Sequence, residues 1–92
     1  MMKATKIHMN TGCEASNNEI DINSIYLIGC TNPGWFLKEV LYDYLKEHPE
    51  TIQVNRYPFP YLVPVLSSKN EKYVRSEPDE FKRDNLLSLP RE

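Results

Sequence analysis

The sequence has few of the features that mark membrane, secreted or nucleotide-binding proteins. Its 92 residues contain no apolar run near the roughly 20 residues that a membrane-spanning helix needs. The N-terminal stretch MMKATKIHMN lacks the apolar segment of a secretory signal. Only three glycines are present, Gly12, Gly29 and Gly34, and none belongs to a phosphate-binding motif. We therefore expect a cytoplasmic protein without a membrane partner.

The chain also lacks an excess of charge of either sign. Its formal net charge is −2 and its pI is about 5.7. Residues 1–50 carry −3 and residues 51–92 carry +1. This balance gives no general attraction to nucleic acid or to an anionic membrane. The two cysteines, Cys13 and Cys30, are expected to stay reduced in the cytoplasm, and a disulfide between them is the alternative.

The length and the hydrophobic fraction of 40% fit one domain spanning residues 1–92. Its clearest predicted element is a helix over residues 32–48. Asn32 is typical of an N-cap, Pro33 of the first helical position, and Pro49 ends the helix. At about 100° per residue, the apolar side chains of this helix share one arc, which is expected to pack on a sheet. The arc consists of Phe36, Leu37, Val40, Leu41, Tyr44 and Leu45.

Short alternating segments predict strands around this helix. Ile7 and Met9 share one side of a strand over residues 5–9, residues 10–19 form a flexible loop, and residues 19–30 form a second strand whose later half is buried on both faces. Further strands follow over 51–56, 57–66 and 71–76, with a turn at 67–70.

The predicted fold class is α+β. A small antiparallel sheet of four to five strands carries one amphipathic helix on one face, in the order β-β-α-β-β-β with short C-terminal helical turns. Pro58, Pro60 and Pro64 belong at a bend or at a sheet edge, because proline donates no hydrogen bond to a strand ladder.

The C-terminal segment, residues 76–90, is predicted to close the fold as a clasp. Ser76 and Asp79 have the spacing of a capping box and begin one helical turn, and Asp84 or Asn85 begins a second. Burial of the leucines that follow is expected to seal the core. These are Leu86, Leu87 and Leu89. Truncation before Asp84 is therefore expected to unfold the domain.

The C-terminal part of the chain, from Tyr73 to Pro90, carries a family resemblance. The residues that carry it are Tyr73, Val74, Arg75, Ser76, Pro78 and Asp79, followed by Asp84, Asn85, Leu86, Leu87, Leu89 and Pro90. These residues resemble the C-terminal signature of small bacterial proteins grouped as domain-of-unknown-function family 3892. The resemblance is specific over residues 72–90, loose over 25–66 and absent over 10–24, and the chain departs from the family in YPFPYLVP. It implies a small stand-alone fold in a bacterial or phage-borne cytoplasmic protein, and it assigns no catalytic residue.

Two aromatic groups are candidate partner-binding surfaces. Trp35 and Tyr42, one heptad apart, project to the polar side of the predicted helix and suggest an interface stripe. The alternative is that Trp35 folds over the helix end and Tyr42 lies under a strand edge. Tyr57, Phe59 and Tyr61 alternate with prolines, which favours an extended segment suited to strand addition or to pairing with a second copy. The alternative is a linker whose rings cover the core.

A nucleic-acid interface is the second hypothesis. Its cations are Arg56, Lys69, Lys72, Arg75, Lys82 and Arg83. Tyr57, Tyr61 and Tyr73 would stack on bases. Acidic residues are interleaved with these cations, which weakens the patch.

Catalysis and metal binding have little support in the sequence. The spacings of His8, Cys13, Cys30 and His48 match no zinc pattern and fix no nucleophile pair. We expect no catalytic residue, no metal and no cofactor. The sequence favours a small protein-binding module, such as an inhibitor or accessory factor of a mobile element or phage, whose partner is another protein or a second copy of the chain.

Overall fold

The computed structural model describes residues 1–57, 59–77 and 85–92. Its strands are β1 (Met2–Met9), β2 (Ile22–Ile28), β3 (Gly34–Leu37), β4 (Ile52–Val54), β5 (Leu62–Leu66) and β6 (Lys72–Ser76). The described helices are α1 (Lys38–Glu47) and two short 3₁₀ helices, η1 (Glu19–Asp21) and η2 (Asn85–Ser88). No helix in these ranges is long and apolar enough to cross a membrane.

The described strands form a four-stranded sheet in the order β3-β2-β1-β4 and a separate β5–β6 hairpin. β2 runs antiparallel to both β1 and β3, whereas β4 runs parallel to β1. The predicted α+β class, a small sheet with a helix packed on it, is confirmed. The sheet is mixed where an antiparallel one was predicted, because the crossover through α1 brings β4 alongside β1 in the same direction.

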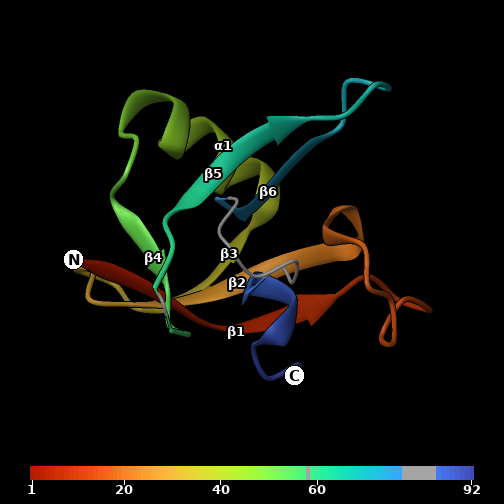
Figure 1. Ribbon diagram of the computed structural model, residues 1–92, viewed down its shortest axis with the longest axis horizontal. Coiled ribbons are helices and arrows are strands. Elements are labelled where there is room, and N and C mark those ends of the chain that lie inside the picture. Colours follow the sequence, from red (N-terminus) through yellow and green to blue (C-terminus); the bar gives the residue numbers. More distant parts are fainter. Residues whose placement is uncertain (58, 78–84) are drawn as a thin grey trace.

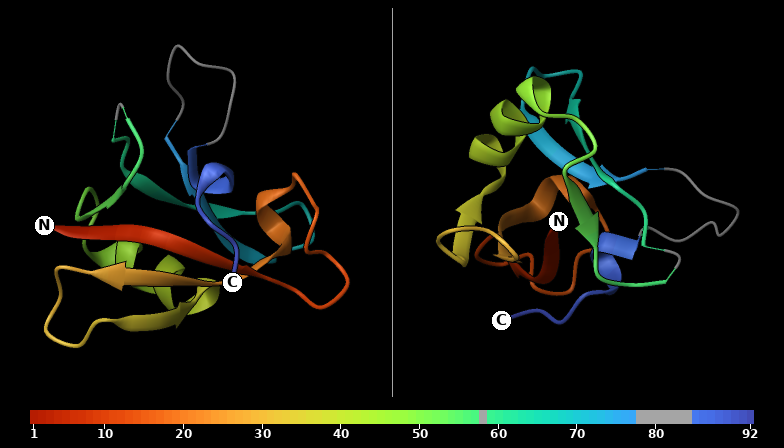
Figure 2. Two further views of the ribbon diagram at one scale, coloured as in Figure 1. Left: turned by 90° about the horizontal axis from the view of Figure 1, so that it is seen from below. Right: turned by 90° about the vertical axis from the view of Figure 1, so that its left-hand side faces the viewer.

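Helix α1 and the β5–β6 hairpin lie together on one face of the four-stranded sheet (Figure 1). The main core lies between these two layers. Its fully buried side chains include Ile7, Ile25, Leu45, Ile52 and Leu62. We call the opposite face of the sheet the outer face. Figure 2, left, looks onto it, with β1, β2 and β3 toward the viewer and α1 behind them.

The predicted start of the helix at residue 32 is wrong, because residues 34–37 form strand β3. Gly34–Leu37 pairs with β2 in antiparallel register, with Trp35 opposite Tyr26 and Phe36 opposite Ile25. Pairing with β2 supplies the backbone hydrogen bonds that a first helical turn would leave unmade. The helix therefore begins only at Lys38, and its N-cap residue Leu37 makes no side-chain capping bond.

The later start also changes which helix face is buried. The buried residues of α1 are Lys38, Leu41, Tyr42 and Leu45, a regular i, i+3, i+4, i+7 stripe. Of the predicted arc, Leu41 and Leu45 are in the core as expected, but Val40 is 51% and Tyr44 38% exposed. The predicted face includes Phe36 and Leu37, which belong to β3, and is therefore rotated toward Val40 and Tyr44.

The first two strands follow the predicted alternation in part. Ile7 and Met9 are buried on one side of β1, as expected, and His8 is exposed on the other. The prediction that the later half of β2 is buried on both faces is wrong, because Ile28 is 40% exposed and Tyr26 only partly buried. These two side chains lie on the outer face, which neither α1 nor the hairpin covers.

The proline-rich segment continues into β5, one of the two strands of the β5–β6 hairpin. Pro64 lies within β5 and pairs with Val74 of β6 in the two-stranded hairpin, a position where proline is tolerated. Pro60 accepts a hydrogen bond from the Val54 amide through its carbonyl oxygen, at 2.8 Å, where the chain leaves β4. Pro58 lies outside the described residues. The hairpin predicted around the turn at 67–70 is confirmed.

The C-terminal residues are joined to the first strand of the sheet. Leu86 and Leu89 are 0% and 4% exposed in the core, and Leu87 packs against it. The Ile7 amide donates to the Pro90 carbonyl at 2.9 Å, and the Glu92 amide donates to the Ile7 carbonyl at 3.0 Å. β4 therefore pairs with the beginning of β1, and the C-terminus pairs with its later part. The predicted capping residues Asp79 and Asp84 lie outside the described residues.

A buried lysine ties the start of α1 to two other segments. Lys38 is only 5% exposed, and its ammonium group donates to the backbone carbonyl of Ile20 in η1. The same group lies 3.7 Å from the Glu71 carboxylate, just before β6. Buried lysines need partners of this kind. Lys38 thereby fixes the position of η1 relative to the helix.

Candidate functional site

A row of side chains crosses the outer face from β1 to β3. The strand register places Lys6 opposite Tyr26 and Tyr26 opposite Trp35. The Lys6 ammonium lies 5.1 Å from the centre of the Tyr26 ring, and the Tyr26 and Trp35 rings meet edge to face at 5.3 Å. His8 contacts Trp35 at 6.2 Å in the same T-shaped geometry. Two aromatic rings, from β2 and β1, therefore contact the indole of Trp35.

Trp35 belongs to a larger apolar area that we call the outer-face patch, made of Tyr26, Ile28, Trp35 and Leu37. Trp35 is 44% exposed, Leu37 50% and Ile28 40%. β3 is also an edge strand, because among the described residues only β2 pairs with it. The opposite edge is occupied by a bridge between Gln53 and Tyr61 and by the C-terminus. An open edge beside exposed apolar side chains is the kind of template that strand addition uses in other proteins.

The predicted Trp35/Tyr42 stripe is wrong as a single surface. Trp35 stands on β3, whereas Tyr42 is 8% exposed and belongs to the core on α1. The ammonium groups of Lys46 and Lys72 lie 5.6 and 5.5 Å from the Tyr42 ring centre. Lys72 begins β6, so Tyr42 is covered by the hairpin, the alternative that the sequence left open. Trp35 and Tyr42 therefore do not share one exposed surface.

The aromatic residues after β4 form a separate exposed cluster. Tyr57 is 78% and Phe59 44% exposed, and their rings contact each other edge to face at 6.2 Å. The Lys3 ammonium lies 5.9 Å from the Phe59 ring centre. Tyr61 is partly buried and bridges to Gln53. Phe59 has a positive φ of 61°, so the chain turns at this residue instead of extending into a free strand.

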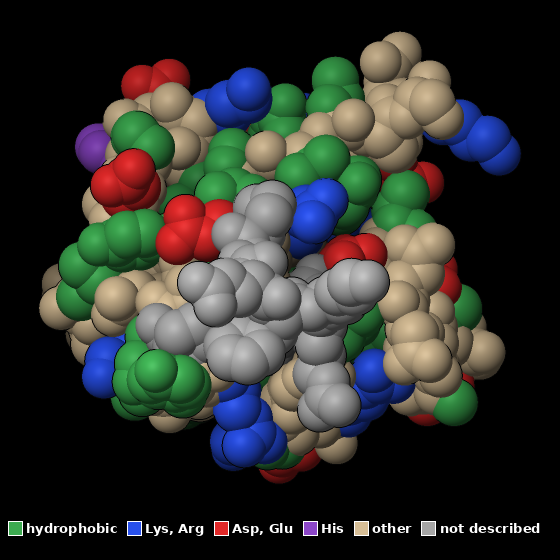
Figure 3. Space-filling view, viewed as in Figure 1, with side chains coloured by type: hydrophobic (Ala, Val, Ile, Leu, Met, Phe, Trp, Pro, Cys, Tyr) green, Lys and Arg blue, Asp and Glu red, His purple; other side chains and the backbone are tan. Residues whose placement is uncertain are grey.

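The predicted nucleic-acid cations are distributed over several elements. Arg56 follows β4 and donates to the Ser88 carbonyl, whereas Lys69 lies in the turn of the β5–β6 hairpin. Lys72 donates to the Asp43 carboxylate at 2.8 Å, and this contact raises the pKa of Lys72 above its ordinary value. Arg75 lies on β6, and Lys82 and Arg83 are outside the described residues. Figure 3 shows basic and acidic side chains interspersed on one face outside the grey residues.

The histidines and cysteines do not form a cluster. His8 lies on the outer face, Cys13 in the loop after β1, Cys30 after β2, and His48 at the end of α1. Both cysteines are free thiols. Among the residues that the structure describes, no three His, Cys, Asp or Glu side chains are placed to share a metal ion.

Cys13 is expected to be a slow nucleophile at neutral pH. Partial burial raises the pKa of its thiol above the ordinary value, and the carboxylates of Asp21 and Glu14 raise it further. Because the thiolate reacts and the thiol does not, alkylation at pH 8 is expected to be slower in the folded chain than in urea. Iodoacetamide labelling of a Cys30→Ser variant, followed by mass spectrometry, measures this rate.

Asp21→Asn in the same background provides the matched variant. It removes the negative charge beside Cys13, so the pKa should fall and labelling at pH 8 should speed up. Equal labelling rates in the folded and the urea-unfolded chain would contradict the raised pKa.

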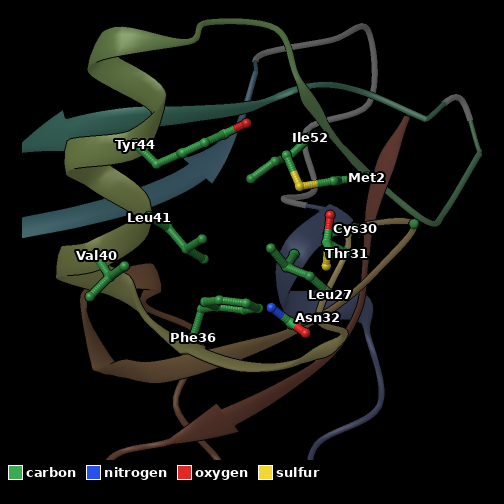
Figure 4. A pocket seen from close by; sticks show the side chains of 11 residues that line it. Met2, Leu27, Cys30, Thr31, Asn32, Phe36, Val40, Leu41, Tyr44 and Ile52 are labelled. Atoms are coloured by element: carbon green, nitrogen blue, oxygen red, sulfur yellow. The ribbon is translucent and has the colours of Figure 1, made fainter.

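A cavity of about 530 Å³ lies between the sheet and α1 on the helix-covered face. It is lined by Met2, Leu27, Gly29, Cys30, Thr31, Asn32, Phe36, Val40, Leu41, Tyr44 and Ile52. The buried side chains of Leu27, Leu41 and Ile52 form its floor, and the more exposed Val40 and Tyr44 form its rim. Figure 4 shows Val40, Leu41 and Tyr44 on the helix side and Cys30, Thr31 and Asn32 on the opposite side.

The wall opposite the helix is shaped by Gly29. Its φ is +80°, and a Cβ added there would lie 2.6 Å from the Met1 carbonyl oxygen. Only glycine fits such a close approach of two backbone segments with this φ. The loop between β2 and β3 is thereby held against the N-terminus, with Thr31 and Asn32 at the cavity.

A family model described as "protein of unknown function (DUF3892)" matches residues 4–90. The chain belongs to DUF3892. The match covers residues 10–24 as well, where the sequence signature shows no resemblance. The searches of curated proteins and of solved structures gave no match.

In this DUF3892 member, several residues in the described part of the family signature are buried and stabilise the fold. Val74 and Ser76 of β6 are 1% and 4% exposed, and Leu86 and Leu89 are core residues. The signature that predicts the family from sequence therefore marks the closing contacts of the core. It does not include the outer-face patch or the residues that line the cavity.

Sequence reasoning missed the cavity in this DUF3892 member. The sequence pattern places Phe36, Val40 and Tyr44 on the packing face of a longer helix. The available signal was an excess of apolar residues on α1, because the stripe Leu41, Tyr42 and Leu45 already supplies a packing face. The sequence predicts the end of a strand and the start of a helix at residues 29–32, but these residues form the loop that completes the cavity.

Proposed function

We propose that this chain is a small protein-binding module that captures an extended segment of another protein along strand β3. One observation carries the proposal: β3 has one open edge within the described structure, and Trp35 and Leu37 beside it are 44% and 50% exposed. Natural sheets usually protect such edges with charges, prolines or bulges. Gly34–Leu37 is short, but it contains no charge, proline or bulge between Pro33 and Lys38.

The arrangement of side chains supports recognition as well as backbone pairing. In strand addition, main-chain hydrogen bonds give affinity and alternate side chains give specificity. Trp35 is held by Tyr26 and His8, so little conformational freedom remains to be lost when a partner binds. Tryptophan is also enriched among the residues that dominate interface energies.

The favoured partner is another protein and not a second copy. A stable dimer commonly buries about 800 Å² on each partner. A strand of only four residues is too short to provide this area by self-pairing alone, whereas a short extended segment of another protein can bind transiently over a smaller area. The inhibitor or accessory role, the mobile-element or phage origin and the cytoplasmic location stay predictions.

The proposal can be tested by selecting, from a displayed library of random linear peptides, those that bind the full chain. We expect the selected peptides to alternate apolar and polar residues and to shift the backbone amide NMR signals of residues 34–37. Trp35→Ala should weaken binding by about 30-fold or more, equivalent to about 2 kcal/mol. Leu66→Ala is the matched control, because Leu66 is 48% exposed but lies on the hairpin.

Methylation of the peptide backbone distinguishes strand addition from simple apolar contact. N-methyl groups on the amides that face β3 should abolish binding, whereas those on alternate amides should be tolerated. Selected peptides that bind equally well to Trp35→Ala, or that shift signals elsewhere, would contradict the proposal. A concentration-dependent dimer in light scattering that needs Trp35 would point to a second copy as the partner.

A further inference from the structure

The cavity between α1, β3 and the loop of residues 29–32 has the size and lining of a ligand site. Its volume of about 530 Å³ lies within the range of about 300–1,000 Å³ typical of small-molecule pockets. Most of its described lining is apolar. Thr31 and Asn32 add polar groups opposite the helix, and Tyr44 adds a hydroxyl group on the helix side. This combination of an apolar body and few polar groups is characteristic of pockets that orient a small ligand.

The rim residues of the cavity are not needed by the core. Leu41 and Leu45 are 2% and 1% exposed and already join α1 to the core. Val40 and Tyr44 nevertheless present apolar surface at 51% and 38% exposure, at positions where a solvent-facing helix usually carries polar residues. Their exposed surface borders the cavity and is available to contact a ligand.

The polar side of the cavity is uncharged. Thr31 and Asn32 are exposed, and their side chains have no hydrogen-bond partner within the described residues, so they are free to bond a ligand. None of the described lining residues is charged. A charged ligand would lose hydration there without a counter-charge, whereas a neutral hydroxyl or amide would keep its hydrogen bonds.

We propose that this cavity binds a small neutral amphiphile. The hydrocarbon part of the ligand lies on Phe36, Leu41 and Val40, and its hydrogen-bonding group meets Thr31 and Asn32. The site is separate from the outer face, because Phe36 points to the opposite side of β3 from Trp35 and Leu37. The inference is independent of the proposed capture of a protein segment.

Titration with 2-naphthol tests the inference on the full chain. This probe has a flat hydrocarbon body and one hydroxyl group, and 2-naphthoate has the same body with a negative charge. We expect 2-naphthol to bind about tenfold more tightly than 2-naphthoate, because the cavity offers no counter-charge. Protein NMR should show shifts at the methyl groups of Leu27, Val40 and Leu41 and not at Leu37.

Two matched variants locate the site. Val40→Glu places a charge at the rim and should weaken 2-naphthol binding about tenfold or more, whereas Leu66→Glu on the β5–β6 hairpin, away from the cavity, should leave it unchanged. Thr31→Val with Asn32→Ala should reduce the preference for 2-naphthol over naphthalene. Equal binding of 2-naphthol and 2-naphthoate, shifts confined to the outer face, or no saturable binding by the unmodified chain would overturn the inference.

Discussion

Replacing Leu86 with alanine is expected to lower the free energy of unfolding by about 2–5 kcal/mol. The Leu86 side chain is fully buried in the core that contains residues from both sheets and from α1. Removing most of this side chain loses its transfer energy and leaves a cavity among neighbours that cannot fully close it. A domain of this size is stable by only about 5–15 kcal/mol, so the change is a large part of the total.

Thermal unfolding followed by circular dichroism measures the effect. Each kcal/mol lowers the melting temperature of a domain of 60–100 residues by about 4–8 °C. Leu87→Ala is the matched control, because Leu87 is only partly buried, and it should cost at least about 1 kcal/mol less. Deletion of all residues from Asp84 onward should unfold the chain. A soluble truncation with a cooperative transition would show that the C-terminus does not close the core.

Leu45→Ala is expected to lower the free energy of unfolding by a similar amount, about 2–5 kcal/mol. Leu45 is 1% exposed on the face of α1 that packs against the core. Its loss should leave a cavity beneath the helix, between the two layers. Chemical denaturation in urea gives the free energy directly and also shows whether the transition remains two-state.

Val40→Ala separates the observed helix face from the face that the sequence predicts. Both faces include Leu45, but only the predicted face includes Val40. Because Val40 is 51% exposed, its substitution should change the stability by no more than about 0.5 kcal/mol. Similar losses for Val40→Ala and Leu45→Ala would instead support the longer helix with its rotated face.

The sequence predicts those parts of the fold whose local pattern agrees with their environment. Ile52 and Val54 alternate with polar neighbours and are buried in β4, and the turn near residue 70 joins two strands as expected. The family signature lies in residues that close the core, so its leucines were correctly placed there. In each case a short stretch of sequence contains the whole signal.

The remaining features depend on contacts between distant residues. Asn32 and Pro33 fit a helix start, but pairing of residues 34–37 with β2 overrides this local preference. The parallel pairing of β4 with β1 and the cavity above Leu41 also arise only when the layers assemble. Trp35 was recognised as a candidate contact residue, but its place on an open strand edge followed only from the pairing of β3.

The bonds between Ile7 and residues 90–92 set a condition on synthesis in the cell. Strand β1 can pair with β2 soon after both are made, but the other edge of its later part finds its partner only after residues 90–92 have been made. At roughly 5–20 residues per second, β1 waits several seconds for this partner. During that interval, an unpaired edge that contains Ile7 and Met9 is exposed to other chains. A nascent-chain chaperone that shields β1 should therefore raise the yield of folded protein.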